Sequence, residues 1–508
     1  MSVAAAPFVT PKLEQVIPDA VRLKDKLTHS AIGQSRYNAT FAPTTGSSGY
    51  SAGGSGAKIC TFRLTSSDFM DAATMCLSFY AKGDNAAATG VAIDEGALSL
   101  IQQITVRAGG VPLFTLLDVP AVYNAMVAQT MPRSVYESDG PAAGLWRHNT
   151  KLGADTSVAG SVVGNWSLQQ VAGAGSYYWD EPAHKAARTA AGLWQSQGRF
   201  YSIPLSWLLP IDRYLCLRNL SSFEIEILFQ SSIGACCVST GLGGATPAQV
   251  PTQINISEME LRADLVRMSP DYYALFDQEI MAGSGVSYDV DVLQSIPFSI
   301  ANSSTAPSQR SFQVSQAVRF LKTVSAVTRL QADLNSIGSS KAKFGNHMFA
   351  GYAIQVNGVQ YPQNPTTKVF DTFQETRKAS NMLGSVVGDS IIGYNEWRGP
   401  VGNGIDPVVA PSRDGTWWGS DPHDAALFIP AVNLETFLTS AQADLQGLNL
   451  LEAGGSLVNV LLTNAPSSID YAANNAAGTL TAAPAQVMVI LHYGGVLSIV
   501  GGAVSFER

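Results

Sequence analysis

The chain has 508 residues and a formal net charge of −8, and 14% of its residues are charged against 46% that are hydrophobic. This length exceeds that of an ordinary single domain and fits two all-β units, while the composition excludes an intrinsically disordered chain. The sequence has no cluster of Lys and Arg, which argues against direct binding of nucleic acid. Low charge with many small residues favours a protein that buries its surface against copies of itself, although a compositional bias of the source genome would give the same pattern.

Residues 1–30 are predicted to form an N-terminal arm, because three prolines surround one short helical segment. The arm is either a frayed terminus or a segment that docks on a neighbouring subunit. It lacks the basic and apolar regions of a signal peptide. The cysteines have no metal-ligand spacing, so we expect buried free thiols in a reducing compartment: Cys60, Cys76, Cys216, Cys236 and Cys237.

The first half of the chain contains several short segments in which apolar and polar residues alternate, as is typical of half-buried strands. After a Gly/Ser-rich loop at 42–57, strands are expected at 58–64, 74–80, 100–106, 200–205, 214–217, 223–229 and 252–265. A helix is expected at 119–130. The tryptophan-bearing stretch 132–198 has little periodicity and is predicted to be a long loop insertion.

The second half repeats this plan. Its strands are expected at 286–298, 348–356, 426–430, 457–462, 487–493 and 496–506, with a second long loop at 384–424. The region 313–330 is expected to contain one or two further strands, but its apolar spacing leaves helix and strand open. The last two strands are predicted to be joined at Gly494-Gly495. Two strands explain this apolar region better than a membrane span, because it never reaches the required apolar length.

One unit of the sequence occurs twice. Residues 352–377 are predicted to form a strand, a turn at Asn357-Gly358, a short strand that Pro362 ends, and a helix. Residues 104–126 follow the same order. The alignment of the two copies pairs Ile104 with Ile354, Val106 with Val356 and Pro112 with Pro362.

The predicted fold class is mainly β, with two tandem eight-stranded antiparallel jelly rolls, short helices and long loop insertions. The first jelly roll is assigned to residues 31–268 and the second to 269–508. Ser269 before Pro270 is a plausible helix N-cap at this junction. Few helices alternate with strands, which disfavours a parallel α/β domain.

No catalytic, cofactor-binding or metal-binding residue is predicted. Ser51 lies in a GxSxG pattern, but a nucleophile elbow needs a strand before the serine and a helix after it, and Ser51 falls in the Gly/Ser-rich loop. Asp421, His423 and Asp424 are of residue types that bind metal ions, but the sequence has no second set of such residues to match them, so a metal site is not expected. The glycines at 241–244 follow no clear strand into a helix, so a phosphate site is not expected there.

Trp417 and Trp418 are the strongest candidates for a surface contact made by a loop. Adjacent tryptophans in a loop could stack on sugars or on a neighbouring subunit, or could pin the loop to its own domain. The alternative function is therefore a tandem β-sandwich protein that binds or cleaves carbohydrate. Its nearest carboxylate pair would be Glu258 and Glu260, which alternation places on one strand face, although a solvated strand face has the same pattern.

Several dispersed segments carry a resemblance to a known family: 352–365 with its following helix, 428–437, 444–449, 492–508 and, in the first half, 198–210 and 223–227. By their order and spacing, the chain resembles double jelly-roll major capsid proteins of the lineage that includes adenovirus-like, Polinton-like, virophage and large algal DNA viruses. No single motif is diagnostic. The loop at 42–57 and the insertion at 132–198 depart from the family pattern.

The resemblance implies a capsid protein without enzymatic activity or cofactors. Three copies would form a pseudo-hexagonal capsomer that tiles the icosahedral shell of a double-stranded DNA virus, assembled inside the host cell and located in the virion. The loops at 132–198 and 384–424 would project outward, with the arm at 1–30 on the inner side. The implied partners are the chain itself, neighbouring capsomers, minor capsid or cement proteins and penton proteins. Host surface glycans and an inner membrane are compatible with the family, but the residues do not indicate them.

Overall fold

The computed structural model describes residues 33–45, 49–84, 91–131, 142–143, 198–239, 250–281, 286–300, 308–337, 341–366, 369–379, 429–435, 447–450, 457–464, 485–500 and 503–507, apart from short gaps within these ranges. The predicted arm at 1–30, the loop at 384–424 and most of the loop at 132–198 lie outside the described residues.

The first unit is built from two antiparallel sheets. Sheet A has the strand order β1-β12-β4-β8, with β2 paired to β12 and β9 to β4, and sheet B has the order β3-β10-β6-β7. A small third sheet pairs β11 with β5. The strands are β1 (Gly33–Phe41), β2 (Tyr50–Gly53), β3 (Ile59–Leu64), β4 (Phe69–Gly83), β5 (Val91–Ile93), β6 (Ile101–Ala108), β7 (Val111–Leu117), β8 (Arg199–Pro204), β9 (Tyr214–Cys216), β10 (Phe223–Phe229), β11 (Cys237–Ser239) and β12 (Gln253–Met268).

The second unit repeats this arrangement. Sheet C has the order β13-β20-β15-β18, with β21 paired to β20, and sheet D has the order β14-β19-β16-β17. The strands are β13 (Val286–Ile300), β14 (Ser308–Ser315), β15 (Phe320–Leu330), β16 (Phe349–Val356), β17 (Val359–Thr366), β18 (Ala431–Asn433), β19 (Leu457–Asn464), β20 (Ala485–Val500) and β21 (Ala503–Glu507). The region 313–330, where the sequence left helix and strand open, therefore contains the end of β14 and all of β15.

Short helices lie at corresponding places in the two units. In the first unit α1 (Val119–Val122) follows β7 and continues into a π-helical turn at Tyr123–Val127, and in the second unit α8 (Val369–Ala379) follows β17. The first unit also contains α6 (Ile233–Cys236). Between the units lies α7 (Pro270–Met281), where the Tyr272 amide donates to the Ser269 hydroxyl at 3.3 Å, as expected of an N-cap.

Strand pairing shows the duplication directly. Each strand of sheet B has a counterpart in sheet D, in the same order: β3 with β14, β10 with β19, β6 with β16 and β7 with β17. Sheets A and C correspond in the same way, through β1 and β13, β12 and β20, β4 and β15, and β8 and β18. Strand β8 ends at Ile203-Pro204, and its counterpart β18 begins directly after Ile429-Pro430, so the two Ile-Pro pairs lie at corresponding places in the two units.

The register of the duplication differs from the predicted alignment. The β6–β7 hairpin turns at Gly109-Gly110 and the β16–β17 hairpin at Asn357-Gly358, and φ is positive at all four residues. When these turns are matched, Ile104 corresponds to Tyr352 and Val106 to Ile354, so the predicted pairing is wrong by two residues. A shift of two residues keeps every side chain on the same face of a strand, so hydrophobic alternation cannot detect it.

Two expected strand ends are also corrected. Strand β17 continues through Pro362 to Thr366, and the missing N–H is tolerated because β17 is an edge strand of sheet D. Strand β20 runs through Gly494 and Gly495, and the chain instead reverses between Val500 and Ala503. A Cβ on Gly495 would lie 2.6 Å from the Phe506 ring, so this glycine permits close packing rather than a turn.

The predicted Gly/Ser-rich loop contains a strand that sequence composition did not indicate. In β2, Tyr50 and Ala52 are buried, and the Tyr50 ring lies 6.0 Å from the ring of Phe229. Backbone pairing with β12 and burial of all four residues of β2 thus order a segment whose composition favours a loop.

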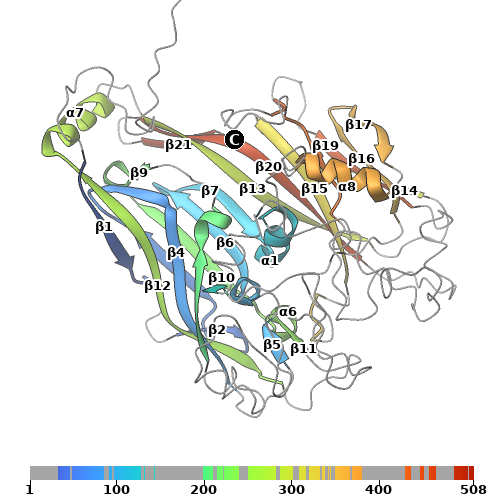
Figure 1. The fold of residues 1–508 in the computed structure, drawn as a ribbon, viewed down its shortest axis with the longest axis horizontal. Helices are drawn as coiled ribbons and strands as arrows, with labels where there is room; N and C mark the ends of the chain where they lie inside the picture. Colours follow the sequence, from blue (N-terminus) through green and yellow to red (C-terminus); the bar gives the residue numbers. More distant parts are fainter. Residues whose placement is uncertain are drawn as a thin grey trace, which may run out of the picture.

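The sheets are stacked in the order A, B, C, D along the longest axis of the molecule (Figure 1). Strand β10 illustrates why these segments form sheets: Phe223, Ile225 and Ile227 point into the core while Glu224 and Glu226 remain partly exposed. The buried apolar residues of both units belong to one contiguous cluster. Sheet A and sheet D consequently form opposite ends of the molecule.

Candidate interaction surface

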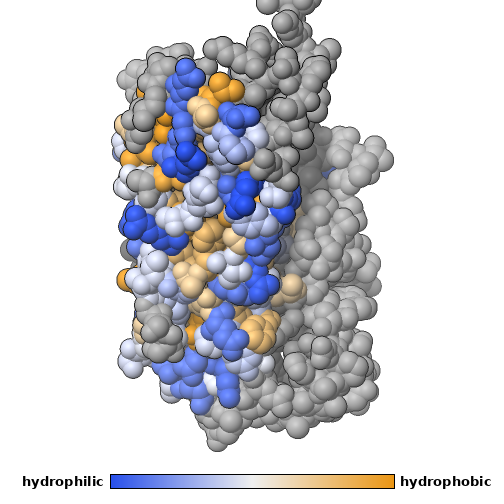
Figure 2. Space-filling view, turned by 90° about the vertical axis from the view of Figure 1, so that its left-hand side faces the viewer, coloured by the Kyte–Doolittle hydropathy of each residue, from blue (hydrophilic) through white to orange (hydrophobic). Residues whose placement is uncertain are grey.

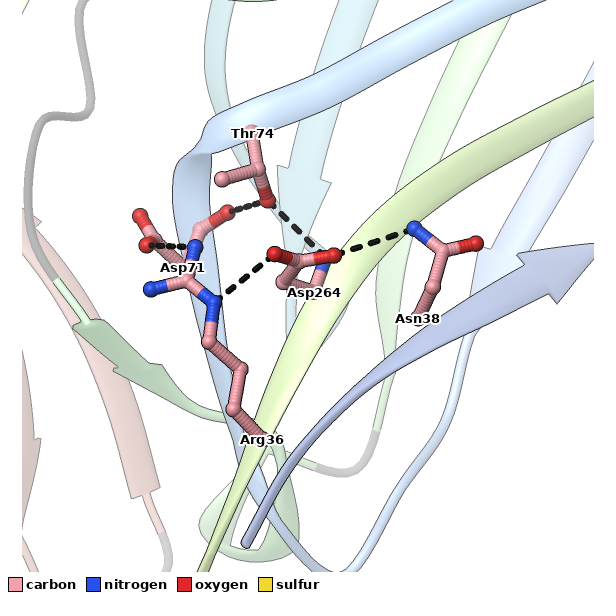
Figure 3. Close-up of polar contacts among 5 residues, drawn as sticks. All are labelled: Arg36, Asn38, Asp71, Thr74 and Asp264. Carbon is pink, nitrogen blue, oxygen red and sulfur yellow. Dashed lines mark hydrogen bonds and ion pairs between the residues drawn. The ribbon is translucent and has the colours of Figure 1, made fainter.

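The face of sheet A that points away from the core carries a polar network (Figure 3). Arg36 on β1 donates to Asp264 on β12 at 2.8 Å and to Asp71 on β4 at 2.9 Å. Asn38 donates to the second Asp264 oxygen at 3.0 Å. The Thr74 hydroxyl accepts from the Asp264 amide at 2.9 Å and donates to the Asp71 carbonyl at 2.8 Å. The network joins three neighbouring strands.

Both carboxylates of this network share one arginine, Arg36. Hydrogen bonds from Asn38 and Arg36 lower the pKa of the Asp264 carboxyl below its ordinary value, and the bond to Asp264 raises the pKa of Arg36. Further along β12, Arg262 donates to Glu260. The carboxylates of Asp71, Asp264 and Glu260 are therefore held by arginines and are not arranged as an acid–base pair.

Small and aromatic side chains continue the same face along β4 and β8. The Cys76 thiol lies 2.8 Å from the Ser202 hydroxyl, and Ser78 donates to Ser202 at 3.4 Å. Beyond them the rings of Tyr80 and Phe200 lie 5.0 Å apart, and Phe200 is 60% exposed. Figure 2 shows this end of the molecule, with apolar residues along its middle between hydrophilic ones. We call this surface the sheet A outer face.

The whole chain matches solved viral capsid proteins in structure. It aligns with VP54 of PBCV-1 over 95% of this chain and 99% of that chain, with a TM-score of 0.54 and 12% identity. A second comparison, with the chain in the PBCV-1 virus capsid, has a TM-score of 0.53 and 13% identity, again covering 95% of this chain and 99% of that one. The chain of the Sputnik virophage structure aligns over 100% of this chain and 93% of its own length, with a TM-score of 0.52 and 12% identity.

These matched chains are double jelly-roll major capsid proteins. The present chain has the double jelly-roll fold. No protein-family model and no curated protein matches its sequence. Sheets A and B thus form the first jelly roll and sheets C and D the second, which confirms the predicted fold class. The exact boundary predicted between residues 268 and 269 stays a prediction.

The sequence-predicted site residues are not brought together. Ser51 lies in β2, is 2% exposed and donates to the Gly53 carbonyl at 3.3 Å, and no helix follows it. Glu258 has a left-handed φ of 52° at an irregularity of β12, so the strict alternation expected for Glu258 and Glu260 is interrupted. Other candidates lie outside the described residues: Trp417, Trp418, Asp421, His423, Asp424 and 241–244.

Among the residues that the structure describes, no group of three or more His, Cys, Asp or Glu residues could hold a metal ion. No described helix is long and apolar enough to cross a membrane. The sheet A outer face remains the most extensive candidate site, and the sequence did not single it out, because alternation in β4 and β12 predicts an exposed face without indicating what contacts it.

The two jelly rolls meet through the end of β7, helix α1 and sheet C. The Leu117 amide donates to the Ser295 hydroxyl at 3.1 Å, which in turn donates to the Leu117 carbonyl at 2.6 Å. Arg329 on β15 donates to Asp118 and, at 2.8 Å, to Gln486. Only 4% of the Arg329 side chain is exposed. A charge pair with a buried arginine therefore links the two jelly rolls.

A buried carboxylate, Asp68, ties sheet A to helix α7. Asp68 is 2% exposed and accepts hydrogen bonds from Tyr37 at 2.6 Å and Tyr273 at 2.8 Å. Arg267 donates to the same carboxylate at 3.4 Å. Burial opposes ionisation, but the two tyrosine bonds and the Arg267 charge outweigh it, so the pKa of Asp68 is lowered from 3.8.

We expect Asp68→Asn to remove an acid-sensitive part of the stability. Because the folded-state pKa is lowered, the ionised carboxylate stabilises the protein above pH 3.8, and this contribution is lost as the pH falls through the folded-state pKa. The urea midpoint of Asp68→Asn should lie below that of the wild type at pH 7, and the gap should narrow below about pH 4. A gap that stays constant from pH 7 to about pH 2 would contradict this role for Asp68.

Proposed function

We propose that this chain is the major capsid protein of a double-stranded DNA virus, with a homotrimer as its pseudo-hexagonal capsomer. One observation carries the proposal: the structure aligns with solved capsid proteins along nearly the full length of both chains. Those chains come from the PBCV-1 capsid and from the Sputnik virophage. In this proposal the protein is a structural component of the virion and has no enzymatic role.

The arrangement of the two jelly rolls supports self-assembly. Sheets A and D lie at opposite ends of one chain, so a contact between unlike ends can be repeated from copy to copy and closes into a ring if the rotation permits. The net charge of −8 argues against the chain itself binding the genome. Further proposed partners are neighbouring capsomers, minor capsid or cement proteins and penton proteins.

Electron microscopy of the purified full-length chain at increasing concentration tests the capsid proposal. The expected result is pseudo-hexagonal particles of uniform size that pack into sheets or closed shells. Particles of one-chain size under all conditions would contradict it. The carbohydrate alternative has no specific structural support among the described residues, and specific binding to a glycan array by a persistent monomer would favour it instead.

A further inference from the structure

The β6–β7 and β16–β17 hairpins are built alike but differ in one side chain. Both turn through two residues of positive φ, Gly109-Gly110 in the first jelly roll and Asn357-Gly358 in the second. At each turn the first residue donates its backbone N–H to a carbonyl at the start of the adjacent strand, that of Ser222 before β10 at 2.7 Å and that of Leu457 in β19 at 3.1 Å. Asparagine and glycine both suit such a turn, so the turn itself does not require the Asn357 side chain.

The side-chain carbonyl of Asn357 is polarised by the neighbouring strand. Its Oδ1 accepts a hydrogen bond from the Leu457 amide at 3.2 Å. A donor at this oxygen stabilises the negative charge that develops when a nucleophile adds to the side-chain carbon. The Nδ2 group of the same amide is buried and has no hydrogen-bond partner in the described part of the chain. Asn357 therefore combines an activated acyl carbon with a leaving group that no hydrogen bond holds in place.

The backbone nitrogen of Gly358 is the nearest nucleophile along the chain. Val356 pairs with Val359, so the turn has two residues and the Gly358 N–H is not part of the β16–β17 ladder. Gly358 is exposed, and a Cβ at this position would meet no described atom within 4 Å. Glycine also has the freest backbone and no side chain beside the attacking nitrogen. Attack on the preceding side chain is intramolecular and is favoured for that reason.

We propose that Asn357 is a site of spontaneous deamidation. The Gly358 nitrogen loses its proton and bonds to the side-chain carbon of Asn357. The bond from this carbon to Nδ2 breaks, and Nδ2 takes up a proton and leaves as ammonia. Water then opens the five-membered succinimide at either of its carbonyl carbons, which gives aspartate or isoaspartate at position 357. The net change is the exchange of one ammonia for one water, without an oxidant or a cofactor.

Isoaspartate at this position should loosen the β16–β17 hairpin. It routes the main chain through the side-chain carbon and so adds one methylene group to a two-residue turn, whose length fixes the pairing of Val356 with Val359. Strand β17 is the edge strand of sheet D, and β16 is its one neighbour among the described strands. The hairpin therefore has no second partner on that side to hold its register. This chemistry belongs to a single chain and does not depend on assembly.

Peptide mapping by mass spectrometry of the folded full-length chain, aged in warm and mildly alkaline buffer, tests the proposal. Acid forms at Asn357 should accumulate at least about tenfold faster than at Asn38 and Asn255, which are exposed but are followed by residues larger than glycine. Equal rates at the three positions in the folded chain, when the urea-unfolded chain does convert Asn357, would overturn the proposal.

Methylation by protein isoaspartate methyltransferase with S-adenosylmethionine identifies the product. The peptide that contains position 357 should become labelled as the chain ages. The other Asn-Gly pair of the sequence, 403–404, lies outside the described residues, so the label is assigned peptide by peptide. Absence of label from the 357 peptide after ageing would contradict the formation of isoaspartate there.

The matched control variant is Asn357→Gly, which gives the second hairpin the Gly-Gly turn that the first hairpin has at 109–110. This variant should fold and should keep its urea midpoint on ageing, because it has no side-chain amide at the turn. The urea midpoint of the wild type should fall as isoaspartate accumulates. An equal fall in both proteins would overturn the assigned effect of this modification on the hairpin.

Discussion

Replacing Asp118 with asparagine is expected to lower the stability of the protein by about 3 kcal/mol, because it leaves the Arg329 guanidinium buried without a counter-charge. Asp118 adopts a left-handed φ of 54°, a conformation that asparagine tolerates, so the substitution removes the charge without adding backbone strain. Arg329 would keep its hydrogen bond to Gln486 at 2.8 Å, which places the loss at the lower end for a broken buried pair. Urea unfolding at pH 7 measures this loss.

Replacing Arg329, the partner of Asp118, should lower the stability of the protein by less than Asp118→Asn does. Arg329→Met removes the buried cation and leaves Asp118, whose side chain is 29% exposed and can be hydrated, so the expected loss is about 1–2 kcal/mol. The double variant Asp118→Asn/Arg329→Met should be more stable than Asp118→Asn alone. A larger loss of stability for Arg329→Met than for Asp118→Asn would contradict the account that an unpaired buried cation causes the loss.

Replacing Phe69 with alanine is expected to destabilise the protein by about 3–5 kcal/mol, as for other large aromatic residues in a core. Phe69 is 1% exposed at the start of β4. Its ring lies 5.4 Å from that of Phe276, 6.0 Å from that of Tyr272 and 6.2 Å from that of Tyr273. All three belong to α7, so the substitution should also detach this helix from sheet A.

Urea unfolding measures the loss of overall stability, and hydrogen exchange of the α7 amides measures the detachment of this helix from sheet A. In Phe69→Ala, amides of α7 should lose protection before those of β10. The matched control is Phe200→Ala on the same sheet. Because Phe200 is 60% exposed, this substitution should lower the stability by less than about 1 kcal/mol. Similar urea midpoints for the two variants would contradict the role of the Phe69 cluster.

Local patterns predicted much of the sheet structure because alternation reports directly on burial. Strand β10 has the predicted bounds, since Glu224 and Glu226 separate fully buried apolar residues. The errors arose where packing overrides local signals. Gly495 looks like a turn residue but accommodates the Phe506 ring, and Pro362 looks like a strand end but lies on an unpaired edge.

The contacts between elements could not be predicted from the sequence. Asp118 and Arg329 are 211 positions apart, and neither belongs to a motif. Arg36, Asp71 and Asp264 likewise converge only because β12 pairs with both β1 and β4. The tryptophan pair at 417–418, which the sequence singled out as a surface contact, lies outside the described residues and stays a prediction.

The mass of the full-length chain in solution tests the central claim most directly. Multi-angle light scattering of the purified protein should give three times the chain mass of 53.7 kDa, and this species should persist on dilution while it remains competent to assemble into larger particles. A single species of 53.7 kDa at every concentration would contradict the proposal that this double jelly-roll chain builds a capsid.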